Sequence, residues 1–222
     1  MKGLAEYQAL TYLKEYGINV VPMKLVADME EALNFVEEVA YPVVLKGVVR
    51  DLYHKSELGI VKININNDEM LKKAWGEIEQ SVNKTGMKSE GMLIQKMVHG
   101  VEVIVGASYE EQFGPVVMVG IGGIYTEIFR DVAFRLAPVT LDEAYHMLKE
   151  LRLYKILKGA RGQGQLCIDG LLDIVVKVSN LITNEGIKEI DLNPVIVTLQ
   201  DAIVVDALII QTANGDGRLC KY

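Results

Sequence analysis

Oxygen-bearing side chains alternate with apolar ones in the segment EIDLNP, residues 189–194. In a β-strand, side chains two residues apart share a face, so Glu189, Asp191 and Asn193 are expected to point the same way. Carboxylate and amide oxygens are ligands that Mg²⁺ accepts, with phosphate oxygens completing its shell. The segment therefore predicts either a magnesium site or the solvated face of an antiparallel hairpin.

Asp206 favours the metal interpretation, because it stands between the apolar runs IVV and ALII, where a lone acid is not expected without a partner. If residues 200–201 form a two-residue turn, the closing hairpin pairs Val195 with Asp206. This register puts Asp206 one diagonal step from Asn193, about 7–8 Å away at Cα. We expect both side chains to reach one ion.

Two cationic positions near residue 50 could handle phosphate. Lys46 ends the strand-like run YPVVLK, where a lysine can bind phosphate as a point charge or can simply extend into water. His54 and Lys55 follow in HKSELG. A histidine there can act as a base, a nucleophile or a ligand, or can be a loop residue without a role.

A glycine-rich block over residues 114–138 contains neither a P-loop nor a G-x-G-x-x-G fingerprint. Its glycines either let backbone N–H groups approach a phosphate or mark a bend between strands. Arg130 and Arg135 could neutralise phosphate charge, or could pair with Glu127 and Asp131. Both interpretations stay open from the residues alone.

The composition limits the class of function. The chain has 222 residues, a formal net charge of -7 and a sequence pI of about 5.1, which disfavours nucleic-acid binding. Cys167 and Cys220 form no CxxC pattern and are too few for a disulfide framework, so we expect a cytoplasmic protein. No signal peptide and no uninterrupted apolar run long enough for a membrane span is found.

Hydrophobic periodicity predicts the elements that position these residues. Helices are expected over residues 4–16, 28–40, from about 67 through 75, 140–151 and 168–182. Strands are expected over 19–26, 41–49, 59–65, 92–98, 101–109, 114–122 and 132–139, with two more between 187 and 210. The later strands follow one another without crossover helices, which favours an α+β fold with largely antiparallel sheets.

Local signals refine this outline. Asp28 with Glu31, and Thr140 with Glu143, have the spacing of capping boxes at helix starts. The alternation of VKINI, residues 61–65, predicts a half-buried strand. A boundary in the loop at 82–91 would give two lobes, residues 1–90 and 91–222. A cleft between two lobes is a common ligand site.

The order of these segments resembles the ATP-grasp subunit of ADP-forming acyl-CoA synthetases, relatives of the succinyl-CoA synthetase β-subunit. The similarity runs from about residue 3 to 210 and is carried by YPVVLK, HKSELG-IVKIN, the block from VHGVEVIVG to FRLAP, KGARG, and EIDLNPVIV with VVDA. One departure is Leu58, where the family usually has glycine. The resemblance implies an ATP-grasp fold, with two α+β lobes gripping a nucleotide.

The resemblance also implies roles for individual residues. On the nucleotide, Lys46 would contact phosphates and Glu102 would accept from the ribose hydroxyls. The inter-lobe segment would meet adenine through backbone groups, and it consists of Gln95, Lys96, Met97 and Val98. Apart from the resemblance, Arg135 is kept as a candidate phosphate-binding residue on the strength of its charge in the glycine-rich block.

The remaining implied roles concern the metal and the phosphoryl group. Asn193 and Asp206 would hold Mg²⁺, with Asp191 as a helper. His54 would carry the phosphoryl group transiently between a partner's phosphohistidine and ADP or ATP, and Lys55 would be its charge partner. The family reaction is acyl-CoA + ADP + phosphate ⇌ acid + CoA + ATP.

This chain resembles only the nucleotide half of that enzyme. It has no dinucleotide-type glycine fingerprint for CoA, so a larger CoA-binding partner subunit in a hetero-oligomer is expected. Two alternatives remain. One is an ATP-grasp ligase that activates a carboxylate on this chain without His54, and the other is a non-catalytic nucleotide-sensing module.

Overall fold

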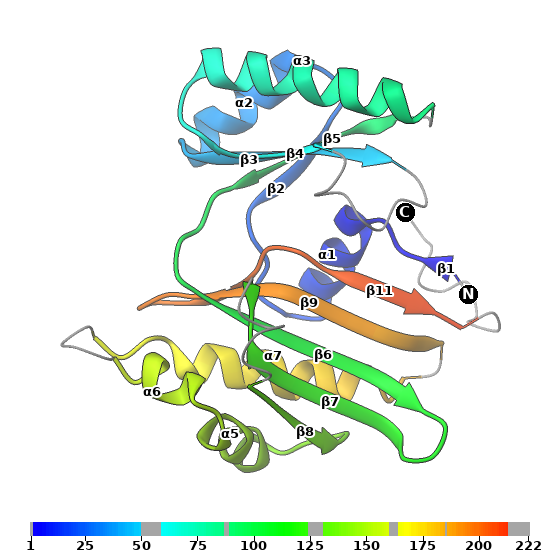
Figure 1. Cartoon of the computed structure of the whole chain (residues 1–222), viewed down its shortest axis with the longest axis vertical. Helices are drawn as coiled ribbons and strands as arrows, with labels where there is room; N and C mark the ends of the chain where they lie inside the picture. Colours follow the sequence, from blue (N-terminus) through cyan, green and yellow to red (C-terminus); the bar gives the residue numbers. More distant parts are fainter. Residues whose placement is uncertain are drawn as a thin grey trace. The chain divides into compact units, whose positions relative to one another are not determined.

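The computed structural model describes residues 2–49, 59–86, 89–123, 131–159, 164–184 and 186–212. The chain divides into two compact units (Figure 1). The larger unit consists of residues 1–20 and 99–222, and the smaller unit consists of residues 21–98. Each unit holds one sheet, and the strand pairings within both sheets are antiparallel, as the sequence predicted.

This division differs from the expected boundary after residue 90. Strand β5 (Ser89–Lys96) pairs with both β2 (Met23–Val26) and β3 (Val43–Val49), so a cut at 90 would split one sheet. At the other end, β1 (Lys2–Gly3) pairs with β11 (Leu208–Gln211). Backbone pairing therefore assigns the N-terminal residues to the larger unit.

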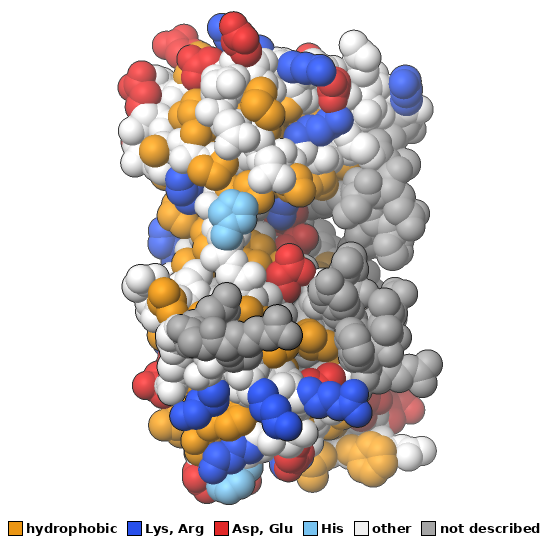
Figure 2. All heavy atoms as spheres, turned by 60° about the vertical axis from the view of Figure 1, so that its left-hand side comes forward, with side chains coloured by type: hydrophobic (Ala, Val, Ile, Leu, Met, Phe, Trp, Pro, Cys, Tyr) orange, Lys and Arg blue, Asp and Glu red, His pale blue; other side chains and the backbone are white. Residues whose placement is uncertain are grey.

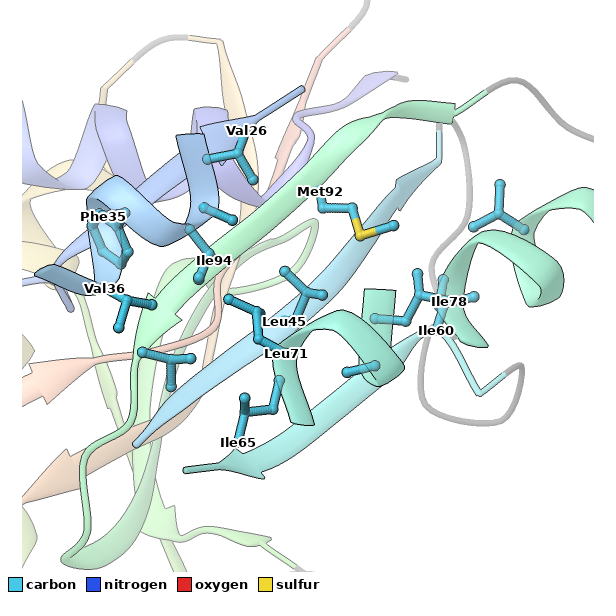
Figure 3. Packing of buried hydrophobic residues seen from close by; sticks show 14 of the residues in the cluster. Val26, Phe35, Val36, Leu45, Ile60, Ile65, Leu71, Ile78, Met92 and Ile94 are labelled. Atoms are coloured by element: carbon cyan, nitrogen blue, oxygen red, sulfur yellow. The ribbon is translucent and has the colours of Figure 1, made fainter. Parts of the chain in front are cut away.

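The smaller unit is a four-stranded sheet covered on one face by two helices. The strand order is β2-β5-β3-β4, with β4 at Val61–Ile65. Helices α2 (Met29–Val39) and α3 (Asp68–Thr85) lie against it. Figure 3 shows the packing of apolar side chains from these helices against those of the strands, among them Phe35, Leu45, Leu71 and Ile94.

Gly47 lets α3 approach β3 closely. A Cβ added at this glycine would lie 2.9 Å from Cγ2 of Ile78 and 3.2 Å from Cγ2 of Val82, both on α3. Real Cβ atoms do not approach other atoms this closely, so a larger residue would force the helix and strand apart. Odd-numbered positions of β3 therefore face the helices, and Lys46 faces the other way.

The larger unit has a seven-stranded sheet with helices packed on it. The strand order is β1-β11-β9-β6-β7-β8, with β10 also pairing with β9. Its remaining strands are β6 (Val101–Glu110), β7 (Gly114–Ile121), β8 (Val132–Leu136), β9 (Ile187–Val197) and β10 (Ala202–Val204). Its helices are α1 (Glu6–Glu15), α5 (Leu141–Glu150), α6 (Leu153–Leu157) and α7 (Ile168–Leu181). Helix α7 packs against β6, β7 and β9.

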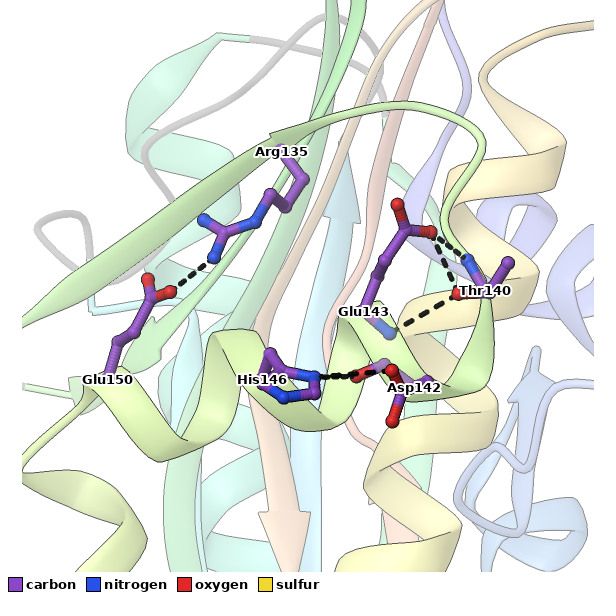
Figure 4. A network of polar contacts seen from close by, with 6 residues as sticks. All are labelled: Arg135, Thr140, Asp142, Glu143, His146 and Glu150. Carbon is purple, nitrogen blue, oxygen red and sulfur yellow. Dashed lines mark hydrogen bonds and ion pairs between the residues drawn. The ribbon is translucent and has the colours of Figure 1, made fainter.

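The predicted helix caps form. The Asp28 side chain accepts from the N–H of Glu31 at 2.9 Å, and Glu31 in turn accepts from the N–H of Ala27 at 2.8 Å. Thr140 and Glu143 form a full capping box, visible in Figure 4 together with the ion pair of Arg135. These bonds satisfy N–H groups that a helix start leaves without an intrahelical partner.

The strand at 61–65 exists but does not alternate as predicted. Ile65 is buried, whereas Ile63 is 59% exposed. Asn64 has a positive φ of 58°, and the register between β3 and β4 shifts between Val43 and Leu45. A left-handed residue and a bulge interrupt the pleat, so the period of two is lost there.

The surface carries charges of both signs. Figure 2 shows Lys and Arg side chains gathered low on one face, over α5 and α6, where Lys149, Arg152, Lys155 and Lys158 are exposed. Within the described ranges, no helix combines the length and apolarity that crossing a membrane requires.

Candidate functional site

The acidic candidates of the larger unit share one face of its sheet. Asp191 pairs with Gly106 of β6, and Glu189 pairs with Ser108. Glu102 lies on the same face as these two positions of β6, because even-numbered residues of that strand point the same way. Val103, Val105 and Ala107 of β6 are apolar and buried, which directs this face toward α7 and turns the acids away from it. The prediction that Glu189 and Asp191 share a face agrees with this register.

The register of the closing strands corrects the predicted position of Asp206. Val195 pairs with Val204, not with Asp206, because the connection between β9 and β10 is longer than the assumed two-residue turn. Leu208 pairs with Asp191 in the same register. If this register is extended across residues 205–207, which lie between the two strands, Asp206 falls level with Asn193 and not one step along the diagonal. Opposite positions are about 4.5–5.5 Å apart, so the correction brings the two side chains closer.

Asp191 lies in an electrostatic environment that opposes its charge. Burial is the main cause that raises the pKa of Asp191, and the neighbouring carboxylates of Glu189 and Asp206 raise it further. A raised carboxyl pKa means that the negative form is unstable without a compensating cation. Acids that destabilise one another on a sheet face are therefore suited to binding a cation.

These residues fit a divalent cation that also binds phosphate. The donor set is two carboxylates and one amide, Asp191, Asp206 and Asn193, all oxygen donors of the kind that Mg²⁺ takes. Among the described residues, no three His, Cys, Asp or Glu side chains form a metal-binding group by themselves. An ion held here would need further oxygens from outside the protein, as in phosphate-bound magnesium sites.

Glu102 lies against a glycine turn. The N–H of Gly122 donates to the Glu102 carbonyl at 2.9 Å. A Cβ at Gly123 would lie 2.0 Å from Oε2 of Glu102, and Gly123 has a positive φ of 68°. Gly122 therefore lies against the backbone of Glu102 and Val103, and Gly123 lies against the Glu102 carboxylate. From the sequence, these glycines were expected either to let backbone N–H groups approach a phosphate or to mark a bend between strands, and the phosphate role stays a prediction.

In the smaller unit, Lys46 and Gln95 share the face away from its helices. Lys46 pairs with Leu93 and Val44 pairs with Gln95, so the two polar residues are one diagonal step apart. Lys46 is 8% exposed and Gln95 is 2% exposed. A lysine this buried differs from one that extends into water, and its low exposure favours a defined role.

The segment from Gln95 to Val98 is held by backbone bonds within the smaller unit. The N–H of Lys96 donates to the Pro22 carbonyl at 2.9 Å, and that of Met97 donates to the Pro42 carbonyl at 3.0 Å. Gln95 itself lies inside the sheet ladder. The N–H groups of Lys96 and Met97 are therefore engaged within the smaller unit.

Arg135 has a carboxylate partner inside the larger unit. Its guanidinium pairs with Glu150 of α5 (Figure 4), and it also donates to the Phe134 carbonyl at 2.7 Å. Asp131, the alternative partner, instead accepts from the N–H of Leu153 at 2.9 Å and caps the start of α6. The phosphate role of Arg135 stays a prediction.

His54 and Lys55 lie outside the described residues, as do Arg130 and Glu127. Sequence reasoning missed the contact of Gly123 with Glu102 and the electrostatic role of Glu189. The alternation of EIDLNP already put Glu189 on the same face, and that signal could have added it to the site.

Comparison with known proteins places the chain among nucleotide-binding proteins. The model of the ATP-grasp domain family matches residues 1–210. The chain is 45% identical to the acetate–CoA ligase [ADP-forming] I subunit beta of Pyrococcus furiosus, over 94% of this chain and 92% of that protein.

Solved structures of acetyl-coenzyme A synthetase 1 from Ca. Korarchaeum cryptofilum share its fold. A complex with coenzyme A, Ca-AMPCP and HgCl+ has a TM-score of 0.89 and 41% identity, covering 95% of this chain and 94% of the other. A complex with coenzyme A and Mg-AMPPCP, its phosphohistidine segment pointing towards the nucleotide site, has a TM-score of 0.82 and 40% identity over 95% and 93%. The α+β architecture expected from the sequence is confirmed, and the chain belongs to the ATP-grasp family.

Proposed function

We propose that this chain is the nucleotide-binding subunit of an ADP-forming acyl-CoA synthetase. In the direction of ATP formation, it transfers a phosphoryl group from phosphohistidine to ADP. The complete reaction converts acyl-CoA, ADP and phosphate to the acid, CoA and ATP. The proposal rests on family membership and on relatives that carry the name of a ligase β-subunit.

One observation carries the proposal furthest. Extending the register of β9 with β10 and β11 across residues 205–207 puts Asp206 level with Asn193, and Asp191 nearby has a pKa that is raised by burial, Glu189 and Asp206. On a fully solvated hairpin face, water would keep the pKa of Asp191 near its ordinary value. The arrangement supports a cation site next to phosphate oxygens.

On the nucleotide, each half of the chain supplies different groups. Lys46 is proposed to meet the phosphates, and Glu102 accepts from the ribose hydroxyls. The Val98 N–H donates to N1 of adenine, since the other N–H groups of its segment are already used. The Lys96 carbonyl accepts from the 6-amino group.

Mg²⁺ belongs to the proposal as a bound cofactor. Asn193 and Asp206 would hold it, with Asp191 as a further ligand or as a charge nearby. When bound, it would neutralise phosphate charge during phosphoryl transfer. The solved structure of a relative is a complex with Mg-AMPPCP, which supports the choice of ion.

The histidine relay and the partner complete the proposal. Neutral imidazole is nucleophilic near pH 7, so His54 can accept the phosphoryl group from a partner's phosphohistidine and pass it to ADP, with Lys55 beside it. The partner is proposed to bind CoA and the acyl group. A reducing, cytoplasmic setting is part of the same proposal, given the sparse cysteines of the sequence.

A two-stage experiment tests the function. The full chain is first titrated with Mg-ADP and Mg-ATP by calorimetry, and micromolar binding that disappears with EDTA is expected. The chain is then mixed with a CoA-binding partner subunit and ATP labelled on the γ-phosphate. Acid-labile label should appear on this chain, and ADP should chase it back to ATP.

His54→Asn separates the alternatives. The relay predicts that this variant binds Mg-ADP normally but takes up no label and supports no acyl-CoA synthesis. An ATP-grasp ligase that activates the carboxylate directly would keep its turnover. A nucleotide-sensing module would bind nucleotide and show no turnover even as wild type. Absence of nucleotide binding by the wild type, with and without its partner, would end the proposal.

A further inference from the structure

The side chain of Lys96 is tied to a neighbouring turn. Its ammonium donates to two consecutive carbonyls, those of Ala40 and Tyr41, each at 3.0 Å. These carbonyls follow the end of α2, where helix carbonyls lack intrahelical partners and a cation is favourable. Lys96 therefore points into its own unit, and its side chain is occupied before any nucleotide arrives.

The turn that Lys96 binds is strained. Ala40 has φ 59° and ψ 162°, a region that essentially only glycine adopts without cost. A residue stays in such a conformation only when its surroundings hold it there. The two carbonyls converge on one ammonium in this conformation, so the contact with Lys96 is part of what holds the turn.

Pro22 forms only one of the two backbone hydrogen bonds that a residue opposite Lys96 would normally form. Its carbonyl accepts from the Lys96 N–H at 2.9 Å, in the register that continues from Met23 opposite Gln95. An ordinary residue in this position would also donate its own N–H to the Lys96 carbonyl. Proline has no N–H, so it cannot. The Lys96 carbonyl is thereby withheld from the ladder at the point where the strand ends.

We propose that Pro22 and the Lys96 ammonium are specificity-determining and positioning residues for the purine base. Pro22 keeps the Lys96 carbonyl available to accept from a 6-amino group, and the ammonium clamp fixes that carbonyl and the Val98 N–H in place. The pair selects a base with an amino group at position 6 and an acceptor at N1. A 6-oxo purine presents the opposite pattern and meets acceptor with acceptor and donor with donor. This inference rests on the proposed function of the chain.

Enzyme kinetics with matched variants test the proposal. The complete enzyme, reconstituted with its partner, is assayed with ADP and with IDP, which differ in the base alone. Lys96→Met should raise KM for ADP about tenfold with kcat within about twofold, as expected for lost positioning of a bound base. Pro22→Ala should lower the preference for ADP over IDP about tenfold, because a restored N–H competes for the Lys96 carbonyl.

Two controls match the variants. Lys24→Met removes an exposed lysine from the neighbouring strand β2, and Pro115→Ala removes a strand proline from the larger unit. Neither should change KM or the ADP preference. Lys96→Arg, which retains a cation with several donors, should recover most of the wild-type KM. If Lys96→Met does not fold, Lys96→Gln replaces it with the same expectation.

Amide hydrogen exchange decides the clamp independently of catalysis. In the full chain without nucleotide, Lys96→Met should speed exchange at residues 95–98 and 40–42 and leave β3 unchanged. This readout separates the clamp from the proposed function, because it needs no bound ADP. Unchanged exchange at 95–98, or an equal loss of activity with ADP and IDP in Pro22→Ala, would overturn the inference.

Discussion

The two units prepare their polar groups in opposite ways. In the smaller unit, polar groups near the proposed base and phosphate sites are satisfied by the unit itself: Lys96 binds two carbonyls, and the N–H groups of Lys96 and Met97 have acceptors. In the larger unit, Asp191 is made less stable as an anion by burial, Glu189 and Asp206. In the smaller unit, the hydrogen bonds that fix the proposed base site exist without ligand. In the larger unit, crowded carboxylates carry an excess of negative charge that a bound cation would neutralise.

This contrast separates two kinds of preorganisation. A satisfied edge can fix geometry without any ligand, since its hydrogen bonds exist already. A crowded acidic face stores electrostatic repulsion that is released only when a cation binds. Substitution of Lys46 or Lys96 in the smaller unit should therefore change nucleotide affinity while leaving stability nearly constant, whereas substitutions of acids in the larger unit should change stability and affinity in opposite directions.

Lys46→Met gives the largest expected effect on the proposed reaction. The change removes a buried cation but keeps an unbranched side chain of similar length, so kcat/KM for ADP should fall about 1000-fold. The free energy of unfolding should stay within about 1 kcal/mol, because Met fills the same space. Lys62→Met serves as the control. Lys62 lies on the adjacent strand β4 and forms a partly exposed ion pair with Glu77, so this variant should retain activity. Comparable losses in both variants would remove Lys46 from the proposed site.

Two glycines compare the rigidity of the units. In Gly122→Ala, the new Cβ would lie 2.9 Å from three backbone atoms of Glu102 and Val103, which cannot rotate away. In Gly47→Ala, it would meet side-chain methyl groups of Ile78 and Val82, which can move away only if α3 shifts slightly from β3. We expect losses of about 3 kcal/mol for Gly122→Ala and about 1–2 kcal/mol for Gly47→Ala in urea unfolding.

The glycine variants also differ in function. Gly122→Ala should weaken nucleotide binding, because it displaces Glu102, whereas Gly47→Ala should leave affinity within about twofold if Lys46 keeps its place. Equal destabilisation by the two substitutions would show that the backbone around Glu102 adapts as readily as a packed core.

The pH dependence of stability in Asp191→Asn tests whether the carboxylates on this face repel one another. The pKa of Asp191 is higher in the folded chain than its ordinary value of 3.8, so the folded state retains this proton to a higher pH than the unfolded state. Its contribution to the free energy of unfolding therefore falls as pH rises through that window and is constant above it. The amide cannot ionise and lacks this penalty.

The measurement is the difference in unfolding free energy between wild type and Asp191→Asn from pH 3 to 8, without divalent cations. The variant should gain on the wild type as pH rises, and added Mg²⁺ with ADP should stabilise the wild type more than the variant. A difference that is flat with pH would mean that the face tolerates its acids without a cation.

Local signals in the sequence predicted much of the fold. Period-two and helical patterns located most strands and most helices, and capping residues located the starts of α2 and α5. The short strand β1 and the helix α6 were not predicted, and the two strands expected between 187 and 210 are three, β9, β10 and β11. The failures are where backbone geometry departs from the regular period. Asn64 in a left-handed conformation left Ile63 exposed, and a longer turn after β9 shifted the partner of Val195 by two residues.

The candidate site was predicted in part, for a related reason. Alternation put the acids on one face, because strand geometry fixes that without any knowledge of partners. Register decides which acids lie opposite each other, and it depends on turn length, which the sequence did not reveal. The clamp of Lys96 on Ala40 and Tyr41 joins residues far apart in the chain and leaves no local pattern.

The predicted helix caps of the two units, Asp28 of α2 and Thr140 of α5, allow a comparison with the smallest expected effects on stability. Thr140→Ala removes one side of a reciprocal capping box, in which Thr140 and Glu143 each accept from the other's N–H. Asp28→Ala removes the acceptor of the Glu31 N–H, while the Glu31 side chain accepts from the N–H of Ala27 and not from that of Asp28. Each should cost about 1 kcal/mol. Hydrogen bonds from the Thr140 backbone and side chain lower the pKa of Glu143, so this cap contributes fully above the ordinary Glu pKa and is lost as pH falls. The loss of stability in Thr140→Ala, measured by thermal unfolding, should therefore shrink from pH 7 to pH 3. Thr140→Ser, which keeps the hydroxyl, should have nearly the stability of the wild type. A cost that does not change with pH would mean that the Thr140 hydroxyl stabilises the helix without help from the Glu143 carboxylate.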